Sequence, residues 1–513
     1  MTRWPAQPVI YEVNTVVWLG ELSRRYGRRV TLGDVPADAW DELALPGVDA
    51  VWLMGVWERS PAGLRIAQQN EELQRSFREA LPDLHPEDVV GSPYCVRRYV
   101  ADGSLGGPAG LAAARETLAG RGIRLLLDYV PNHVAPDHPW VSEHPEYFVR
   151  GDASDLELTS PAFINAAGNV LALGRDPYFA PWPDVVQLNA FAPELRDATA
   201  EVLTEIGSQC DGVRCDMAML LMNDVFARTW GERAGPVPAA DFWPQVLGRV
   251  RGQHPDMLFL AEAYWDLEWA LQQQGFDYCY DKRLYDRLLH ESAGDVRAHL
   301  LADVAYQRRL VRFLENHDEP RAAATMPPGK ERAAAVMIAT LPGATLWHEG
   351  QFEGRRVRPP VFLARRPEEP ADGDLRVFHR QLLEAVHALG LREGEWRLLD
   401  SAGWPDNPTH RNLLAWCWQG AGRHIVIVNL SDQPAEGRVQ LPWNDLQGER
   451  WQLSELLSEA AYEREGTELA GSGLFVALDG WRWHLVSLLE AVPAGAGFEP
   501  VEASGRRTSA PSE

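Results

Sequence analysis

Residues 123–130 read IRLLLDYV, a short apolar run that carries Asp128 near its end and is followed by Asn132 and His133. A run that is apolar almost throughout is typical of a parallel strand buried on both faces. Apolar-periodic stretches such as 194–209 separate this run from its neighbours and predict helices. Seven similar runs occur at 9–18, 48–54, 212–217, 257–263, 277–281, 310–316 and 344–350. Eight strands with intervening helices predict an α/β fold, a closed (β/α)8 TIM barrel, with an open doubly wound sheet as the structural alternative.

Two connections of the predicted barrel are too long for simple loops between a strand and its helix. Residues 55–100 follow the second strand and contain a polar, helical stretch at 66–80. Residues 134–186 follow the third strand, are rich in proline, aromatic and acidic residues, and predict an inserted domain, called domain B below. Both leave from carboxyl ends of strands, where barrels carry their active sites, so long insertions there predict a lid or a subdomain beside the site.

The hydrophobic pattern changes beyond a predicted helix at 374–391. Short alternating runs at 413–420, 423–431, 437–443, 474–480 and 481–490 predict a C-terminal antiparallel β-sandwich. The last residues are small and polar, which predicts a disordered tail. We therefore expect a barrel over 1–133 and 187–390, domain B over 134–186, the sandwich over 391–490 and the tail over 491–513.

Composition restricts the partners that this chain can have. The formal net charge of −24 argues against nucleic acid, because a phosphate backbone is bound by clustered basic residues. No stretch approaches the ~20 apolar residues that span a bilayer, and the N-terminus lacks a secretory pattern, so we expect no membrane partner and a cytoplasmic location. The five cysteines form no CxxC pair, which predicts buried free thiols. The sequence leaves the oligomeric state open.

Ionisable residues stand at the ends of several predicted strands. Arg214 and Asp216 lie two residues apart and therefore share one face of the fourth strand. Glu262 ends the fifth strand, and the seventh runs into His317 and Asp318. Because a closed barrel brings these ends to one rim, we expect the three carboxylates to line a single cavity.

Three carboxylates and an arginine fit the chemistry of glycosidic-bond cleavage with retention. A retaining glycosidase uses an ionised carboxylate as nucleophile and a protonated one as general acid. We expect Arg214 to lower the pKa of Asp216 and keep it charged. Glu262 has Ala and aromatic neighbours in FLAEAYW, and an apolar setting would raise its pKa, as a general acid needs. Asp318 can stabilise positive charge that develops on the sugar.

These motifs also resemble the signatures of the α-amylase family of glycoside hydrolases. The resemblance runs in order from residue 9 to about residue 490, including the terminal β-domain. The segments that carry it are DYVPNH (128–133), VVQLN (185–189), GVRCDMAML (212–220), AEAYW (261–265) and FLENHD (313–318).

The resemblance implies a role for each residue of the predicted cavity. It implies Asp216 as the nucleophile, Glu262 as the general acid/base and Asp318 as a stabiliser that holds the sugar. It implies that Asp128 orients Arg214 from behind the cavity. Around the glycosyl subsite, which holds the sugar whose bond is broken, it implies Tyr94 as a stacking residue together with His133, Arg214 and His317.

The chain departs from the family pattern at the leaving-group side. Met219 and Leu220 stand where amylases of the family often have Lys-His, so we expect fewer polar contacts to the leaving group or acceptor. Cys95 and Arg98 stand near Tyr94 where many members carry aspartate.

Calcium is the metal that the resemblance raises. Asn132 matches a position that often binds Ca²⁺ in the family, and Asp176 or Asp184 could add oxygen ligands. Calcium takes six to eight oxygens, more than the sequence assembles, so both a calcium site and a purely structural Asn132 stay open. No cofactor is required for the expected chemistry.

The substrate is expected to be an α-linked oligosaccharide or a small glucoside. Hydrolysis is the first hypothesis, transfer, isomerisation or phosphorolysis by the same covalent route is the second, and a non-catalytic binding subunit is the third. Candidate sugar platforms near loop ends are Trp57, Trp140, Trp182 and Trp265. An anionic substituent could contact Arg355, Arg356 and Arg358 after the eighth strand, although a solvated or salt-bridged loop explains these arginines as well.

Overall fold

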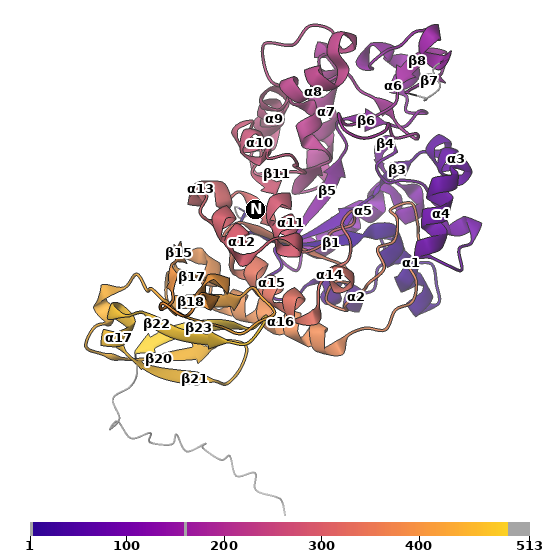
Figure 1. The fold of residues 1–513 in the computed structure, drawn as a ribbon. Helices are drawn as coiled ribbons and strands as arrows, with labels where there is room; N and C mark the ends of the chain where they lie inside the picture. The colour runs from indigo at the N-terminus through magenta and orange to yellow at the C-terminus, as the bar shows by residue number, and fades with distance from the viewer. Residues whose placement is uncertain (1–3, 158–161, 491–513) are drawn as a thin grey trace, which may run out of the picture.

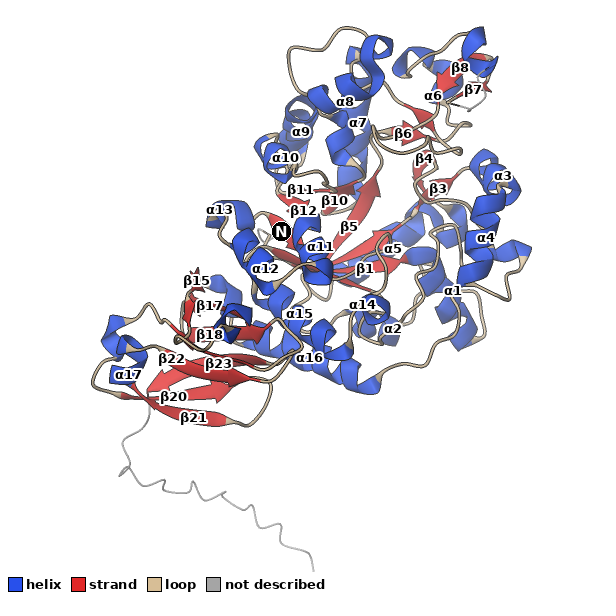
Figure 2. Cartoon of the chain, viewed as in Figure 1, coloured by secondary structure: helices blue, strands red, loops and turns tan. Residues whose placement is uncertain are grey.

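The computed structural model describes residues 4–157 and 162–490, and its centre is a closed barrel of eight parallel strands (Figures 1 and 2). β14 pairs with β1 and closes the barrel, which confirms the predicted fold and excludes the open sheet. Apolar side chains fill the barrel, and a larger apolar core lies between the strands and the helices. The strands are β1 (Val9–Asn14), β2 (Ala50–Met54), β5 (Arg124–Tyr129), β10 (Gly212–Cys215), β11 (Leu258–Ala261), β12 (Tyr278–Tyr280), β13 (Leu310–Arg312) and β14 (Ala344–His348).

Helices cover the outside of the barrel (Figure 2). None of those within the described residues is long and apolar enough to cross a membrane. They are α1 (Thr15–Tyr26), α2 (Ala37–Leu43), α5 (Gly107–Ala119), α7 (Pro193–Gln209), α8 (Asn223–Trp230), α9 (Phe242–Gln253), α10 (Glu268–Gln273), α11 (Lys282–His290), α12 (Ala293–Leu300), α13 (Val304–Gln307), α14 (Ala322–Thr325), α15 (Pro328–Thr340) and α16 (Gly373–Ala388).

The first strand is shorter than the apolar run 9–18 predicts. It ends at Asn14, whose side chain accepts a hydrogen bond from the Val17 N–H and so caps α1. The residues after Asn14 are apolar because α1 turns its buried face to the barrel. An apolar run therefore does not distinguish the end of a strand from the start of a packed helix.

The segment 55–100 adds β3 (Trp57–Arg59), α3 (Pro61–Gln69), α4 (Glu71–Ala80) and β4 (Val96–Ala101) beside the barrel rim. The predicted helix 66–80 is two helices, because Asn70 ends α3 and its side chain accepts from the Leu73 N–H to begin α4. β3 and β4 form a small antiparallel sheet.

Domain B leaves and rejoins the barrel through a two-stranded sheet in which His133 pairs with Gln187. It lies beside β4 and α7 (Figure 1). Its described strands and α-helix are β6 (His133–Val134), α6 (Trp140–Glu143), β7 (Phe163–Ala166), β8 (Asn169–Ala172) and β9 (Val186–Gln187).

The C-terminal domain is a β-sandwich, as predicted, of a six-stranded and a three-stranded antiparallel sheet. It packs beside α15 and α16 (Figure 1). The predicted tail 491–513 lies outside the described residues. The first sheet contains β15 (Glu395–Leu399), β17 (Leu413–Gln419), β18 (Arg423–Asn429), β20 (Arg450–Glu455), β21 (Ala461–Glu465) and β23 (Trp483–Glu490); the second contains β16 (Ser401–Ala402), β19 (Ala435–Val439) and β22 (Leu474–Leu478).

Candidate active site

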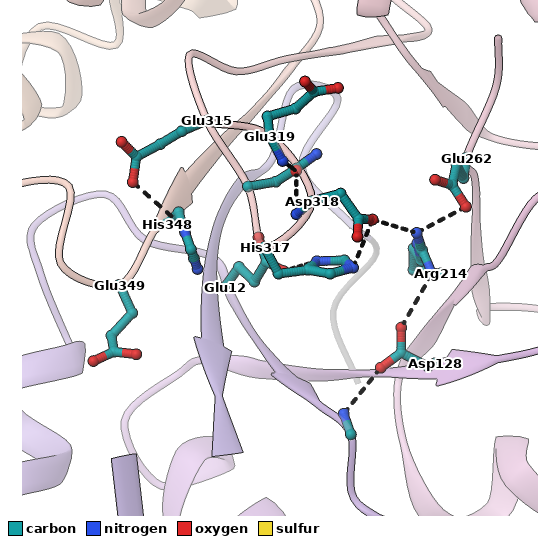
Figure 3. A network of polar contacts seen from close by, with 12 residues as sticks. Glu12, Asp128, Arg214, Glu262, Glu315, His317, Asp318, Glu319, His348 and Glu349 are labelled. Atoms are coloured by element: carbon teal, nitrogen blue, oxygen red, sulfur yellow. Dashed lines mark hydrogen bonds and ion pairs between the residues drawn. The ribbon is translucent and has the colours of Figure 1, made fainter. Parts of the chain in front are cut away.

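A fully buried arginine at the end of β10 organises the carboxyl rim of the barrel (Figure 3). One terminal nitrogen of Arg214 lies 2.6 Å from Asp216 Oδ1, and the other lies 2.8 Å from Glu262 Oε2. Asp128 and Asp318 follow at 3.6 and 3.9 Å. The parallel register places Arg214 directly opposite Asp128 of β5, so neighbouring strands bring these groups together. This geometry brings the strand-end carboxylates together around one arginine, as the closed barrel predicts.

Aromatic rings surround the Arg214 guanidinium. Its carbon lies between 5.3 and 5.8 Å from the ring centres of Trp52, Tyr94 and Tyr280. Ring faces carry partial negative charge and attract a cation. The aromatic rings and the carboxylates therefore both stabilise the positive charge of this buried guanidinium.

Glu262 lies in a more polar setting than its sequence neighbours predict. Its carboxylate accepts hydrogen bonds from the Tyr264 hydroxyl at 2.7 Å and from the Met217 N–H at 2.6 Å. Burial nevertheless raises the pKa of Glu262 to about 7, with Asp216 and Asp318 adding to the rise and Arg214 opposing it. A carboxyl with this pKa is largely protonated below neutral pH and can act as a general acid.

Burial raises the pKa of Asp216, although the Arg214 guanidinium beside it acts in the opposite direction. Arg214 thus lowers the pKa of Asp216 as expected, but burial and the nearby Asp318 and Asp128 carboxylates outweigh it, so the net shift is upward. The 2.6 Å contact still makes Asp216 the carboxylate held closest to the guanidinium.

Asp318 points into the open part of the site, with 45% of its side chain exposed. The Nε2 atom of His317 lies 2.9 Å from its carboxylate. Burial would raise the pKa of Asp318, but His317 outweighs burial and holds the pKa well below its usual range. Asp318 therefore stays negatively charged.

Glu12 in β1 is a member of this network that the sequence interpretation missed. Its fully buried carboxylate accepts a hydrogen bond from His317 Nδ1, while the Tyr94 hydroxyl lies 2.7 Å from His317 Nε2. Burial would lower the pKa of His317, yet Asp318 and Glu12 together raise it well above its ordinary value. A lone carboxylate inside the apolar strand VIYEVN was the signal that could have identified it.

His133 and Asp128 support the site from its sides. His133 packs against Trp182, with ring centres 5.1 Å apart, and burial lowers its pKa to about 4, so it is neutral. Asp128 accepts the Gly55 N–H at 3.1 Å, and burial raises its pKa to about 6 against the pull of Arg214. The position of Asp128 beside Arg214 fits an orienting role.

The residues proposed for calcium use their oxygens elsewhere. Asn132 Oδ1 accepts from the Gln187 side-chain amide at 2.9 Å. Asp176 accepts the N–H groups of Tyr178 and Phe179 at 2.6 and 2.9 Å. Among the described residues, no three Asp, Glu, His or Cys side chains gather as a metal site would require. One oxygen each of Asn132 and Asp176 is therefore already used within the protein, and calcium binding, which takes six to eight oxygens, stays a prediction. Asp184, the remaining candidate, is buried, and burial raises the pKa of its carboxyl to about 6.

Two departures from the family pattern have buried side chains. Met219 and Leu220 belong to a short 3₁₀ helix (Ala218–Leu221) and are buried in the main core. Both side chains are apolar and buried, so they offer the site no polar contact. The chain turns just before them at Met217, which has a positive φ of 44°. Cys95 is also buried, and its thiol donates to the Asp184 carbonyl at 3.0 Å. All five cysteines are free and buried, as expected.

The tryptophans predicted as candidate sugar platforms differ in how far they are buried and in what they contact. Trp57 is buried and its indole N–H donates to the Asp128 carbonyl, so it is structural. Trp140 packs within domain B on Tyr147. Trp265 is partly exposed on the loop after Glu262.

Arg355, Arg356 and Arg358, which follow β14, differ in their hydrogen-bond partners. The Arg355 guanidinium and the Arg356 N–H both bond to Glu369. Arg358 is exposed and donates to the backbone carbonyl of Asp318, at the rim of the site.

No protein-family model matches the chain. The α-amylase MalA of Haloarcula japonica is 25% identical over 401 residues, which cover 75% of this chain and 49% of MalA. A maltosyltransferase of Rhodospirillum rubrum that uses α-1,4-glucan and maltose 1-phosphate is 31% identical over 250 residues, 46% of this chain and 29% of the transferase. The match thus spans about half of MalA and less of the transferase.

Solved structures share the fold over nearly the whole chain. A maltogenic α-amylase from Thermotoga neapolitana aligns with a TM-score of 0.68 and 19% identity, covering 95% of this chain and 99% of its own. An α-amylase from Lactobacillus plantarum gives 0.65 and 20%, covering 94% and 99%. The barrel, its insertion after β5 and the carboxylate cluster define a (β/α)8-barrel enzyme. In sequence the chain is thus similar to an α-amylase, and the solved structures show that it shares the α-amylase fold.

Proposed function

We propose that this enzyme is a retaining α-glycoside hydrolase that cleaves α-glucosidic bonds of oligosaccharides or small glucosides. One arrangement carries the proposal: a fully buried arginine lies 2.6 Å from Asp216 and 2.8 Å from Glu262. The family relatives, which include α-amylases and maltosyltransferases, support an α-glucan substrate.

In the first step, an Asp216 carboxylate oxygen attacks the anomeric carbon, and the bond to the glycosidic oxygen breaks. Glu262 gives its proton to that oxygen, so the leaving group departs as a neutral alcohol. Arg214 stabilises the Asp216 carboxylate before the attack. A pKa of about 7 for Glu262 keeps its proton available at neutral pH.

In the second step, Glu262 takes a proton from water as the water oxygen attacks the anomeric carbon. The ester bond to Asp216 breaks, which frees the sugar and restores the protonated Glu262. Asp318 remains charged throughout and stabilises the positive charge that develops on the sugar ring. His317, held by Glu12, orients Asp318.

Transfer to a sugar acceptor is the second candidate, supported by the relatives that are named maltosyltransferases. It uses the same first step and replaces water by an acceptor hydroxyl. Met219 and Leu220 are buried, so the apolar character of this pair gives transfer no support. A non-catalytic role is disfavoured because all three carboxylates meet around one arginine.

The test is product analysis with maltooligosaccharides, trehalose, sucrose and glucosylated alcohols, each with and without phosphate. Hydrolysis would give free glucose or shortened chains, transfer would give lengthened or rearranged products, and phosphorolysis would give a sugar phosphate. We expect hydrolysis, and we expect Asp216→Asn to abolish turnover. Activity that survives this substitution would contradict the assigned nucleophile.

A further inference from the structure

The loop after β14, residues 349–372, is joined to the long connection that follows β2. The Val90 N–H donates to the Phe362 carbonyl and the Ala364 N–H donates to the Asp88 carbonyl, each at 2.8 Å. We call this pairing the seam. β14 and β2 are the two neighbours of β1 in the barrel, so the seam joins their loops across the carboxyl end of β1.

Ionic and apolar contacts hold the seam together. The Arg365 guanidinium donates to both carboxylate oxygens of Asp88 at 2.8 and 2.9 Å and to both of Asp83 at 2.9 and 3.1 Å. Phe77 and Leu363, one from each loop, are fully buried in one apolar cluster. Forked hydrogen bonds between charged groups are among the strong ones, so these contacts fix the two loops to each other.

Two buried arginines fix the loop after β14 to the rest of the barrel. One nitrogen of Arg366 lies 2.6 Å from a carboxylate oxygen of Glu21 in α1, and another lies 2.6 Å from one of Glu349. Arg321 donates to the Glu315 carboxylate at 2.6 Å and to the Glu349 carbonyl at 2.8 Å. Separating a buried charge from its partner is strongly unfavourable, so the loop stays against the rim.

The seam borders the glycosyl subsite. One loop runs from the seam directly to Tyr94, and the other comes to it directly from Arg358. The Tyr94 hydroxyl lies 2.7 Å from His317 Nε2, and Arg358 donates to the Asp318 carbonyl. Val361, beside the seam, packs like Tyr94 on the apolar cluster that fills the barrel. The joined loops therefore form a wall next to the sugar whose bond is broken.

The seam lies across the rim from the proton donor. In the closed barrel, β1 and β11 are separated by three strands in either direction. Glu262 follows β11, and Glu349, where the loop after β14 begins, lies on the opposite side of Asp318 (Figure 3). The leaving group must lie beside Glu262, because Glu262 protonates its oxygen. Since C4 of a pyranose is across the ring from C1, a chain that continued from O4 would point toward the seam.

We propose that the seam closes the site beyond the glycosyl subsite, so that the enzyme removes single glucose units from the non-reducing end of its substrate. This inference rests on the proposed function and narrows its substrate to short α-glucosides and chain ends. A ring with a free O4 fits between Glu262 and the seam, whereas a ring whose O4 carries another glucose meets the wall. Asp216 and Glu262 are almost fully buried, as expected of a site with a narrow mouth.

The first experiment compares α-glucosyl fluoride with α-maltosyl fluoride. The two donors share the reacting bond and differ by one glucose on O4 of the reacting ring. We expect wild-type kcat/KM to be about a hundredfold or more higher for the glucosyl donor, because the wall excludes the second glucose. Similar values for the two donors would overturn the proposal. Release of no fluoride from either donor, together with intact maltose and maltotriose, would instead contradict the proposed function.

A second measurement uses nitrophenyl maltoheptaoside with and without an ethylidene group that blocks its non-reducing end. We expect glucose as the first product from the free chain and no cleavage of the blocked chain. Shorter oligosaccharides cut from the blocked chain would show internal cleavage and overturn the proposal.

The variant Leu363→Ala/Arg365→Ala removes an apolar and an ionic contact of the seam. The matched control is Leu453→Ala/Arg423→Ala in the C-terminal domain, where Leu453 is buried and Arg423, like Arg365, is 21% exposed and paired with an aspartate. We expect the seam variant to raise the ratio of kcat/KM for maltosyl over glucosyl fluoride about tenfold, and the control to leave it unchanged. An unchanged ratio in a seam variant that still hydrolyses glucosyl fluoride would overturn the seam as the barrier.

Discussion

The Arg214 guanidinium is fully buried, and four carboxylates lie within 3.9 Å of its nitrogens. Burying an ion costs several kcal/mol unless partners replace its hydration. Because Asp216 and Glu262 take the two shortest contacts, they titrate as a pair and not as independent groups. The proton held by this pair is the one that the first chemical step uses.

The pH dependence of activity follows from that proton. Burial raises the pKa of Glu262 to about 7, and the group must be protonated to act as an acid. We therefore expect kcat/KM for an oligosaccharide to fall as the pH rises above about 7. Glu262→Gln should remove this alkaline limb and keep more activity on α-glucosyl fluoride, whose leaving group needs little protonation. A profile that stays flat to pH 9 would contradict the assignment.

The Glu12–His317 pair has a predictable effect on stability. The folded-state pKa of His317 is raised, so its stabilisation is complete below its unfolded pKa and is lost as the pH rises through the folded value. Burial would raise the pKa of Glu12, but His317 outweighs burial and lowers it. The stability that the Glu12 carboxylate contributes is therefore lost as the pH falls through its folded-state pKa. We expect Glu12→Gln to cost about 3–5 kcal/mol at pH 6, measured by denaturant unfolding.

A matched control keeps the Glu12 experiment interpretable. Glu58→Gln removes a partly exposed carboxylate paired with Arg97, which should cost at most about 1 kcal/mol. Nuclear magnetic resonance should also show a lower pKa of His317 in Glu12→Gln. Equal losses in the two variants would mean that burial adds nothing to the Glu12 pair.

The sequence predicts the strand-end carboxylates and not Glu12, and the reason is geometric. Asp216 and Glu262 follow recognisable strands, so a closed barrel must bring them to the same rim. Glu12 lies inside a strand, and its partner His317 is 305 residues away. No local pattern connects such a pair. The burial of Met219 could not be predicted from the sequence either, because it depends on the turn at Met217.

Among the elements, the barrel strands were predictable because they are apolar on both faces. In the sandwich, β17 and β18 were recognised for the same reason. β20 and β21 were missed because β21 is almost wholly exposed and both carry many charged residues. β21 is an edge strand with no buried face to produce an alternating pattern. β20 lies inside the sheet and buries only Trp451 and Leu453, which is a short alternation.

The connection from α15 to β14 depends on one glycine. Gly343 has a φ of 107°, and a Cβ there would lie 2.5 Å from the Leu310 carbonyl oxygen. We expect Gly343→Ala to destabilise the protein by about 1–3 kcal/mol through backbone strain and this clash. Thermal unfolding checks this. The control Gly373→Ala, at an open helical position, should be neutral or stabilising, and equal effects would contradict the argument.

At the scale of the whole molecule, the C-terminal domain and the barrel contribute side chains to one hydrophobic core. The Trp416 and Trp418 indole N–H groups both donate to the Thr340 carbonyl at the end of α15. Their side chains belong to the same apolar cluster as the helices of the barrel. The two domains therefore stabilise each other, and their unfolding should be coupled.

Trp418→Ala tests this coupling. Removing a fully buried tryptophan at the domain boundary should cost about 3–5 kcal/mol, and calorimetry should show the barrel and the sandwich melting in one transition at a lower temperature. Trp404→Ala, at an exposed site, should leave the transition in place. If Trp418→Ala lowered the melting of the sandwich alone, the domains would be independent.

The most direct test of the proposed mechanism is to trap the glycosyl enzyme. A fluorinated α-glucosyl fluoride slows hydrolysis of the ester, so mass spectrometry of the digested protein can locate the sugar. The mechanism predicts one sugar on the peptide that contains Asp216 and none in Asp216→Asn. A sugar attached to Glu262 or Asp318 instead would contradict it.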